Sequence, residues 1–340
     1  MTLSRVAQHA QVSVSTVSRY LRGQLNVQPE TAHRIDLAVR ELDYPVPVPA
    51  QAAPRGRERR PVIALVVPDL SNPFFATLAD EVAAAAAVGG ASLVLGVTGQ
   101  QARREERFSD FVAGTEAIDG MIYVGIHRRN PRLTEAIDDG LPVVVLDEEI
   151  AGAPDVDTIT VDNYGGAHQA TAYLAQLGHR HIAHVSGPPE LSTSRDRLRG
   201  YRDAMAQAGL DVDESLVLHG PYTEQFGAST FPYLTAARRP PTAVFVGSDI
   251  VAVGMLGAAE LHGLRIPEDL SVVGCDGIRV GEWLRPKLTT LRQPITELAT
   301  SALELIQARI DSPGRERVRK VYPLQLVVRG SATPPSAAAG

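Results

Sequence analysis

The chain of 340 residues contains one cysteine, Cys275, so no disulfide can form within it, and a reducing compartment fits this composition. No apolar run approaches the ~18 residues of a membrane span, and the N-terminus, MTLSRVAQHA, has no apolar signal core. A Gly-x-Ser-x-Gly elbow, a phosphate-binding P-loop and zinc-finger spacing are also missing. We therefore expect a cytoplasmic protein with no membrane contact, and we expect neither an enzyme nor a bound cofactor.

Positive charge is scarce overall but concentrated at one end of the chain. The net charge is −6, yet residues 1–60 hold nine arginines against five acidic residues and carry +4. The remaining residues carry −10. A basic head on an acidic body places a phosphate-binding surface at the N-terminus.

The segment of residues 3–21, LSRVAQHAQVSVSTVSRYL, has the pattern of two short amphipathic helices joined by a tight corner. Ser13 is a good cap for the second helix. The apolar side chains that recur at helical spacing are Leu3, Val6, Ala7 and Ala10 in the first helix, and Val17, Tyr20 and Leu21 in the second.

The outward side of the second helix carries Val14, Ser15, Ser18 and Arg19. Short polar groups and one arginine near a helix N-terminus suit the major groove of DNA, because arginine can bond guanine and serine can reach a base or a phosphate. The alternative is an ordinary helical hairpin whose Arg19 is only solvated.

Two further segments complete the N-terminal region. A third helix is expected at residues 29–42, with Pro29 in the first turn, where proline is tolerated, and it completes a headpiece of residues 1–45. Residues 46–60 form a linker whose prolines forbid a continuous helix. Its basic end is either a DNA-contacting hinge or a disordered tether, and it holds Arg55, Arg57, Arg59 and Arg60.

From residue 62 onward, short apolar β-branched runs alternate with helix-like stretches. This alternation predicts parallel sheets that are covered by helices on both faces. The expected strands are residues 62–68, 92–97, 120–126, 142–147, 157–162, 181–187, 242–249, 270–276 and 321–328. The expected helices are residues 73–88, 101–114, 131–139, 165–177, 195–208, 225–237, 250–262 and 295–310.

Motifs along the chain occur together in an order that is typical of one protein family. They are Thr16-Val17-Ser18-Arg19, Ser71-Asn72-Pro73-Phe74-Phe75, Val161-Asp162-Asn163, Leu177-Gly178-His179-Arg180, Arg197-Leu198-x-Gly200-Tyr201 and Pro286-x-Leu288-Thr289-Thr290. On these motifs, residues 2 to about 330 resemble the lactose-repressor (LacI/GalR) family of bacterial transcription regulators. One departure lies at the corner between the first two helices, where the family usually has glycine and this chain has Gln11.

The resemblance implies an all-α helix-turn-helix headpiece joined to an α/β two-lobed periplasmic-binding-protein-like domain with two doubly wound parallel sheets. Residues 61–330 would form this effector-binding and dimerisation domain, and the chain would cross between its lobes near Val161, Gln293 and Tyr322. Lobe 1 would hold about 61–160 plus 294–320, lobe 2 about 161–292 plus 321–330, and residues 331–340 would be a disordered tail.

The resemblance also places base-reading positions of the family on Val14, Ser15 and Arg19. With neighbouring polar groups and two linker arginines, the DNA-binding residues that we expect are Thr2, Ser4, Val14, Ser15, Thr16, Ser18, Arg19, Arg22, Arg55 and Arg57. Family members wedge a leucine into the minor groove, but the linker has no leucine, and its arginines could enter or line the groove instead.

Several expected strands end in polar residues at the sheet edge where doubly wound folds bind ligands. Carboxylates and an arginine beside aromatic rings suit a sugar, whose hydroxyls bond charged groups and whose C–H face stacks on rings. The effector-binding residues that we expect are Asn72, Phe74, Phe75, Asp147, Arg197, Tyr222, Asp249, Asp276 and Gln293.

These residues also have ordinary structural explanations. Asp249 and Asp276 could be helix caps only, and Arg197 could pair with its neighbour Asp196. Of the two adjacent phenylalanines, we expect one to touch ligand and the other to lie in the core.

Three nearby histidines, His179, His181 and His184, look like a metal cluster on paper. In a strand, however, residues 181 and 184 point to opposite faces, so we expect no metal site.

We therefore predict a ligand-controlled transcription regulator, a repressor that binds palindromic double-stranded operator DNA as a homodimer. Its operator affinity would be set by a small-molecule effector, a sugar or sugar derivative, bound between two lobes. The alternative is a solute-binding protein of a sugar transporter, which the N-terminal helices disfavour. A sugar-modifying enzyme is a third class, disfavoured because no nucleophile motif or cofactor loop occurs.

Overall fold

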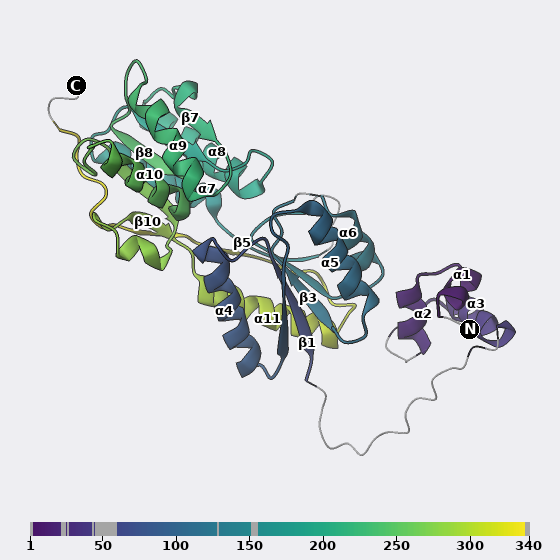
Figure 1. Cartoon of the computed structure of the whole chain (residues 1–340). Coiled ribbons are helices and arrows are strands. Elements are labelled where there is room, and N and C mark those ends of the chain that lie inside the picture. Colours follow the sequence, from purple (N-terminus) through teal and green to yellow (C-terminus); the bar gives the residue numbers. More distant parts are fainter. Residues whose placement is uncertain are drawn as a thin grey trace.

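The computed structural model describes residues 3–21, 25, 27–42, 44, 60–127, 129–150 and 156–336 (Figure 1). The first described part is a three-helix headpiece of α1 (Leu3–Ala10), α2 (Val14–Leu21) and α3 (Pro29–Glu41). Its small core is built from one face of each helix, with Val6, Val17 and Ile35 fully buried.

Lobe 1 is a six-stranded parallel sheet with the strand order β11-β5-β4-β3-β1-β2. The strands are β1 (Val62–Val67), β2 (Ser92–Val97), β3 (Gly120–Tyr123), β4 (Val143–Leu146), β5 (Asp157–Val161) and β11 (Arg319–Tyr322). Helices α4 (Pro73–Val88) and α11 (Ile295–Asp311) pack together on one face, whereas α5 (Ala102–Gly114) and α6 (Pro131–Asp138) cover the other (Figure 1).

Lobe 2 repeats this architecture with the strand order β12-β10-β9-β8-β6-β7, and only β12 runs antiparallel. The strands are β6 (Ile182–Ser186), β7 (Val217–His219), β8 (Ala243–Val246), β9 (Ser271–Asp276), β10 (Thr289–Arg292) and β12 (Gln325–Val327). The helices pack as two pairs, α7 (Asn163–Gln176) with α8 (Ser192–Gln207) and α9 (Glu224–Thr235) with α10 (Asp249–Leu261). Two short 3-10 helices, η1 (Glu214–Leu216) and η2 (Arg279–Glu282), complete the lobe.

The central strands are buried on both faces, which explains their continuous apolar sequences. Every residue of β4 and β8 is buried, and the side chains of both faces enter the cores beneath the helices. Near-continuous valine and isoleucine runs are what a parallel sheet between two helical layers requires. The helix α4 starts where the sequence predicts, because Asn72 accepts a hydrogen bond from the Phe74 amide (3.1 Å) and Pro73 occupies the first turn.

The chain crosses between the lobes after β5, β10 and β11, close to Val161, Gln293 and Tyr322. The expected single strand at 321–328 is wrong, because the structure holds two strands in different sheets. Pro323 separates them; it has no amide hydrogen to continue a ladder, so β11 ends and the chain passes to lobe 2. Sequence patterns also missed the short strands β7 and β10.

The expected disordered tail is wrong for residues 331–336. Ser331 is fully buried; its hydroxyl donates to the Val272 carbonyl (2.6 Å) and accepts from the Thr289 amide (2.8 Å). Two residues on, the Thr333 amide donates to the Ser271 hydroxyl (3.0 Å). The polar composition of these residues suggested a solvated tail, but the structure shows that they form hydrogen bonds that attach the segment to β9 and β10.

Candidate functional site

A cleft lies between the carboxyl ends of the strands of the two lobes. Its free volume is only about 30 Å³, because charged and aromatic side chains fill it. The residues that line it are Asn72, Phe74, Phe75, Ile126, Asp147 and Glu148 from lobe 1, and Leu191, Thr193, Arg197, Tyr222, Ser248, Asp276 and Gln293 from lobe 2 and its crossing. Eight of the nine expected effector residues are therefore brought together here, and Asp249 is the exception.

Arg197 is the central cation of the cleft and is almost completely buried. Its Nε donates to Asn163 Oδ1 (2.8 Å), and its Nη1 donates to the Gly247 carbonyl. Its Nη2 lies 3.8 Å from Asp276 Oδ1. The alternative pairing with Asp196 is wrong, since Asp196 faces Arg199 on the next turn (3.2 Å).

Asp276 presents a carboxylate to the cleft from the end of β9. It accepts hydrogen bonds from the Ser248 hydroxyl (2.7 Å) and from Gln293 Nε2 (3.0 Å). Burial raises the pKa of Asp276, while the Arg197 charge and these hydrogen bonds act in the opposite direction. Its backbone has φ = 123°, an arrangement that L-residues rarely adopt and that concentrates at functional sites.

Asp249 does not line the cleft, so its predicted role as an effector-binding residue is wrong. Its carboxylate instead forms hydrogen bonds within lobe 2. Its Oδ2 accepts from the amides of Gly277 (2.8 Å) and Ile278 (3.0 Å), and its Oδ1 accepts from the Thr290 hydroxyl (2.6 Å). The side chain is fully buried and ties the segment after β9 to α10. The position directly before it, Ser248, reaches the cleft instead.

The aromatic wall comes from the start of α4 and from lobe 2. Phe74 and Phe75 pack edge to face with ring centroids 5.2 Å apart, and both line the cleft although one was expected to lie in the core. Tyr222 shares a hydrogen bond with the Ser194 hydroxyl (2.9 Å), and its ring lies 5.9 Å from the Arg197 guanidinium carbon. Polar groups that can bond hydroxyls are therefore flanked by rings that can cover a sugar face.

Glu148 joins the two lobes and was missed by sequence reasoning. Its carboxylate accepts hydrogen bonds from the Ser192 amide (2.8 Å) and hydroxyl (2.6 Å), and also from the Thr193 amide (3.4 Å) and hydroxyl. These donors stand at the N-terminus of α8, where unpaired amides and the helix dipole favour a negative charge. Within the acidic run Asp147-Glu148-Glu149, nothing local distinguishes this residue from a solvated neighbour.

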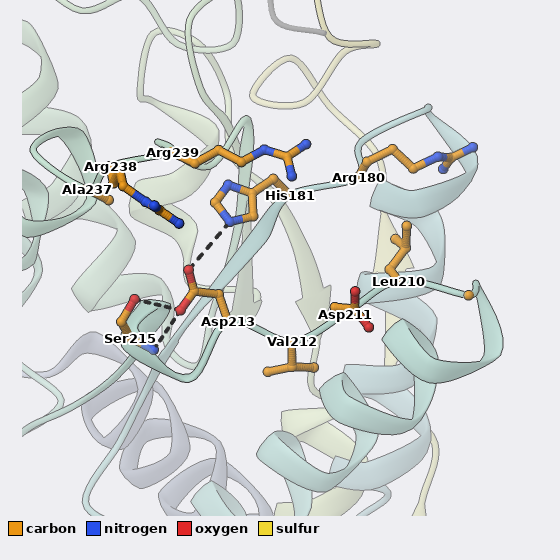
Figure 2. Close-up of a pocket in the computed structure, with 11 residues that line it drawn as sticks. Arg180, His181, Leu210, Asp211, Val212, Asp213, Ser215, Ala237, Arg238 and Arg239 are labelled. Atoms are coloured by element: carbon orange, nitrogen blue, oxygen red, sulfur yellow. Dashed lines mark hydrogen bonds and ion pairs between the residues drawn. The ribbon is translucent and has the colours of Figure 1, made fainter.

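A larger hollow of about 670 Å³ lies at the other end of lobe 2, beside the amino end of β6 (Figure 2). Helices α7, α8 and α9 end near it, and helix C-termini carry partial negative charge. Arg180 offsets one of these ends by donating to the Ala175 carbonyl (3.1 Å), and Asp213 lies 3.8 Å from His181. The cleft at the carboxyl ends of the strands is the candidate ligand site, because eight of the nine expected effector residues line it and none lines this hollow.

In the headpiece, the Ser13 hydroxyl accepts from the Thr16 amide (3.1 Å) and so caps α2 as expected. Gln11 has φ = 55°, the left-handed backbone of the corner between α1 and α2. Val14 and Ser4 are exposed.

None of the other DNA-reading candidates on α2 is buried, namely Ser15, Thr16, Ser18 and Arg19. The Ser18 hydroxyl donates to Glu116 of lobe 1 (3.1 Å). The expected DNA contacts at Thr2, Arg22, Arg55 and Arg57 lie outside the described residues.

The three expected non-ligating histidines occupy separate places. His184 is buried between the rings of Tyr201 and Phe245, with centroids 5.1 and 5.0 Å away, and burial lowers its pKa to about 3. His179 bonds to the Thr333 carbonyl (2.9 Å). Among the described residues there is no group of histidine, cysteine and acidic side chains that could hold a metal ion.

No described helix combines the length and apolar character needed to cross a bilayer.

A helix-turn-helix headpiece ahead of a two-lobed α/β domain with a polar cleft defines the class of ligand-binding transcription regulators. Residues 2–46 match the family model of bacterial regulatory proteins of the lacI family, and residues 171–332 match that of the periplasmic binding protein-like domain. The transcriptional repressor CytR of Escherichia coli K12 is 33% identical over 332 residues, covering 97% of this chain and 96% of the relative.

The transcriptional regulator CelR of Thermobifida fusca is 35% identical over 339 residues, covering 97% of this chain and 98% of the relative. A solved CelR–cellobiose complex has a TM-score of 0.74 at 33% identity, with 97% of this chain and 99% of that chain covered. A lacI-family regulator from Mycobacterium smegmatis has a TM-score of 0.73 at 30% identity, covering 81% of this chain and 100% of that chain. The chain belongs to the lacI family of bacterial transcription regulators.

Proposed function

We propose that this regulator is a repressor whose operator affinity is controlled by a sugar or sugar derivative bound between its lobes. The convergence of Arg197, Asp276 and Asp147 beside two phenylalanine rings is the observation that carries the proposal. Charged planar groups bond paired hydroxyls, and aromatic rings cover the C–H face of a pyranose. The structurally similar CelR was solved with cellobiose, which supports a carbohydrate as the ligand class.

Ligand entry would change the arrangement of the lobes. Pockets for small ligands usually have volumes of roughly 300–1,000 Å³, whereas the cleft has about 30 Å³ of free space. A sugar can enter only if the lobes separate or buried groups such as Arg197 move. We infer that this movement of the lobes changes the spacing of the paired headpieces and thereby alters operator affinity.

Operator reading is proposed for the outward residues of α2. Arg19 stands next to the short polar side chains Ser15 and Ser18, a set that fits base edges in the major groove. Arg19→Ala should cost about 1–3 kcal/mol on the operator and much less on random DNA. Equal losses on both DNAs in a gel-shift titration would make Arg19 a phosphate contact only.

We propose that the protein works as a homodimer in the cytoplasm, where its operator lies. Strand β2 supports a dimer, since it is the edge of the lobe 1 sheet and carries Val94, Leu95 and Val97 at 37%, 41% and 45% exposure. Exposed apolar edge strands are normally covered, and helix-turn-helix proteins bind paired half-sites as dimers. The relatives are regulators rather than transport proteins or enzymes, so we propose ligand binding without catalysis.

A ligand screen combined with one variant tests the effector assignment. A panel of sugars, sugar phosphates and nucleosides is screened by thermal shift, because a ligand that binds the folded state raises apparent stability. Asp276→Asn should lose the shift and the ligand response in a gel shift while keeping operator affinity. Asp80→Asn, on the exposed side of α4, is the matched control. Normal ligand affinity in Asp276→Asn would contradict the assignment.

A further inference from the structure

The loop that follows β3 carries Ile126 into the cleft. Ile126 is half-buried and lines the same cavity as Phe74 and Asp147. It is an apolar wall of lobe 1 in a cleft to which lobe 2 contributes the charged side chains Arg197 and Asp276. The Val124 amide still donates to the Val66 carbonyl (2.9 Å), but residues 125–127 lie outside the strand, so their position depends on side-chain contacts.

The contacts that hold the loop involve one buried carboxylate, that of Glu105 in α5, which is 1% exposed. The Tyr123 hydroxyl donates to its Oε2 (2.6 Å). The Ile126 amide donates to its Oε1 at a long 3.5 Å, and His127 Nδ1 lies 2.9 Å from the same oxygen without hydrogen-bond geometry. All three partners belong to β3 or to the loop itself, so Glu105 connects this loop to α5.

The backbone of the loop packs closely against the Tyr123 side chain, which is bonded to Glu105. A Cβ atom on Gly125 would lie 2.2 Å from the Tyr123 hydroxyl oxygen, so only glycine lets the chain rest on the phenol. Asn130 Nδ2 donates to that hydroxyl (3.3 Å), and Asn130 Oδ1 accepts from the Leu133 amide (3.0 Å) at the start of α6. Both ends of the loop are thereby anchored to the Tyr123–Glu105 pair.

Burial and charge make this arrangement specific. A carboxylate without partners would be very costly at a buried site, so Glu105 and the loop stabilise each other's positions. Burial, and next the charge of Glu105, raise the pKa of Tyr123, so the phenol keeps its proton and remains a donor. Glu105 itself does not line the cleft.

We propose that Glu105 is a positioning residue of the effector site, which holds Ile126 in the cleft as the apolar wall for the C–H face of a sugar. The ligand class in this statement rests on the proposed function, whereas the positioning of the loop does not. Glu105 thus sets the shape of the site through Tyr123 and the Ile126 amide and influences which ligands fit.

The first test measures amide hydrogen exchange in the full-length protein without ligand. Glu105→Gln and Tyr123→Phe should each speed exchange at Val124 to His127 by about tenfold or more, because a buried charge-assisted hydrogen bond is lost. The central strands should keep their protection. Glu106→Gln, the next residue on α5, is the matched control and should change these amides less than about twofold. An unchanged loop, or faster exchange throughout lobe 1, would overturn the positioning role.

The second test is a double-mutant cycle with cellobiose as the probe in calorimetric titrations. Glu105→Gln should weaken binding about tenfold when Ile126 is present but leave it unchanged in the Ile126→Ala background, because Glu105 acts through Ile126. Multiplicative losses would overturn the proposal. If the unmodified protein does not bind cellobiose, that result bears on the proposed ligand, and the exchange experiment alone decides the role of Glu105.

Discussion

Asp147 directly follows β4 in lobe 1, and its ionisation is linked to pH in the neutral range. Burial first, and then the charge of Glu148, raise its pKa to about 7. An unfolded aspartate ionises near ~3.9. The folded state therefore holds this proton more tightly, and the stability that it contributes is present below pH ~4 and lost as the pH rises through about 7.

Asp147→Asn should remove this loss without disturbing the backbone, which has φ = 76°, because asparagine tolerates the left-handed region. Between pH 5 and pH 8, the variant should gain stability relative to the unmodified protein by on the order of 2 kcal/mol. Urea unfolding at the two pH values measures this difference, and Asp80→Asn should leave it unchanged. Parallel pH profiles for Asp147→Asn and the unmodified protein would rule out Asp147 as the group responsible.

The neighbouring residues Glu148 and Glu149 provide a matched pair for testing how the lobes are held together. Glu148 accepts four hydrogen bonds from the start of α8, whereas Glu149 forms an exposed ion pair with Arg319 (2.9 Å). Glu148→Gln replaces an acceptor with a donor that faces other donors. It should destabilise the closed lobes by about 2–4 kcal/mol, while Glu149→Gln should cost less than about 1 kcal/mol.

Small-angle scattering reads out this difference without any ligand. Glu148→Gln should increase the radius of gyration, and Glu149→Gln should not. Identical scattering from the two variants would mean that other contacts hold the lobes together.

Among the elements, the corner between α1 and α2 carries local strain. Gln11 adopts φ = 55°, which costs a residue with a Cβ atom roughly 1–2 kcal/mol. Gln11→Gly removes that cost, but the flexible unfolded chain offsets about 0.4–1 kcal/mol of the gain. The headpiece should become more stable by about 0.5–1 kcal/mol.

Hydrogen exchange of the buried headpiece amides, such as that of Ile35, measures the change. The matched control is Gln8→Gly, at an exposed position within α1, which should destabilise the headpiece by about 1 kcal/mol. If both substitutions destabilise, the left-handed corner carries no strain.

Local sequence signals account for most of the elements and fail where the partner is distant. The bounds of α4 follow from Asn72, Pro73 and the glycines after Val88, all of which act on the adjacent backbone. The division of the last strand into β11 and β12 was missed because apolar character continues across Pro323. Two strands that pair with different sheets have no local signature beyond that proline.

The same distinction applies to the cleft. Side chains that follow strand ends were predictable, since strand polarity alone brings Asp147, Asp276 and the Asn72 region together. Glu148 depends on donors about 44 residues away on the other lobe, and Ile126 depends on a carboxylate in α5. Asp249 has the same strand-end pattern as Asp276, and only the fold shows that its oxygens are already occupied by three donors.

At the level of the whole molecule, the edge strand β2 tests the proposed dimer. Leu95→Lys would place an uncompensated charge in the interface and should weaken dimerisation at least about 100-fold. Sedimentation velocity measures the oligomeric state, and operator affinity should fall with it. Val328→Lys, at a similarly exposed apolar site (54%) in lobe 2, is the control. A dimer that survives Leu95→Lys would show that β2 is not the contact.

The interleaved connectivity of lobe 1 has a consequence during synthesis on the ribosome. The headpiece has its own core and is complete once α3 has left the exit tunnel, whereas the lobe 1 sheet waits for β11 at Arg319–Tyr322. At about 5–20 residues per second, that interval lasts roughly 15–55 s. Each newly made chain therefore carries a folded DNA-binding headpiece for many seconds before the sheet of its ligand-binding domain can be completed.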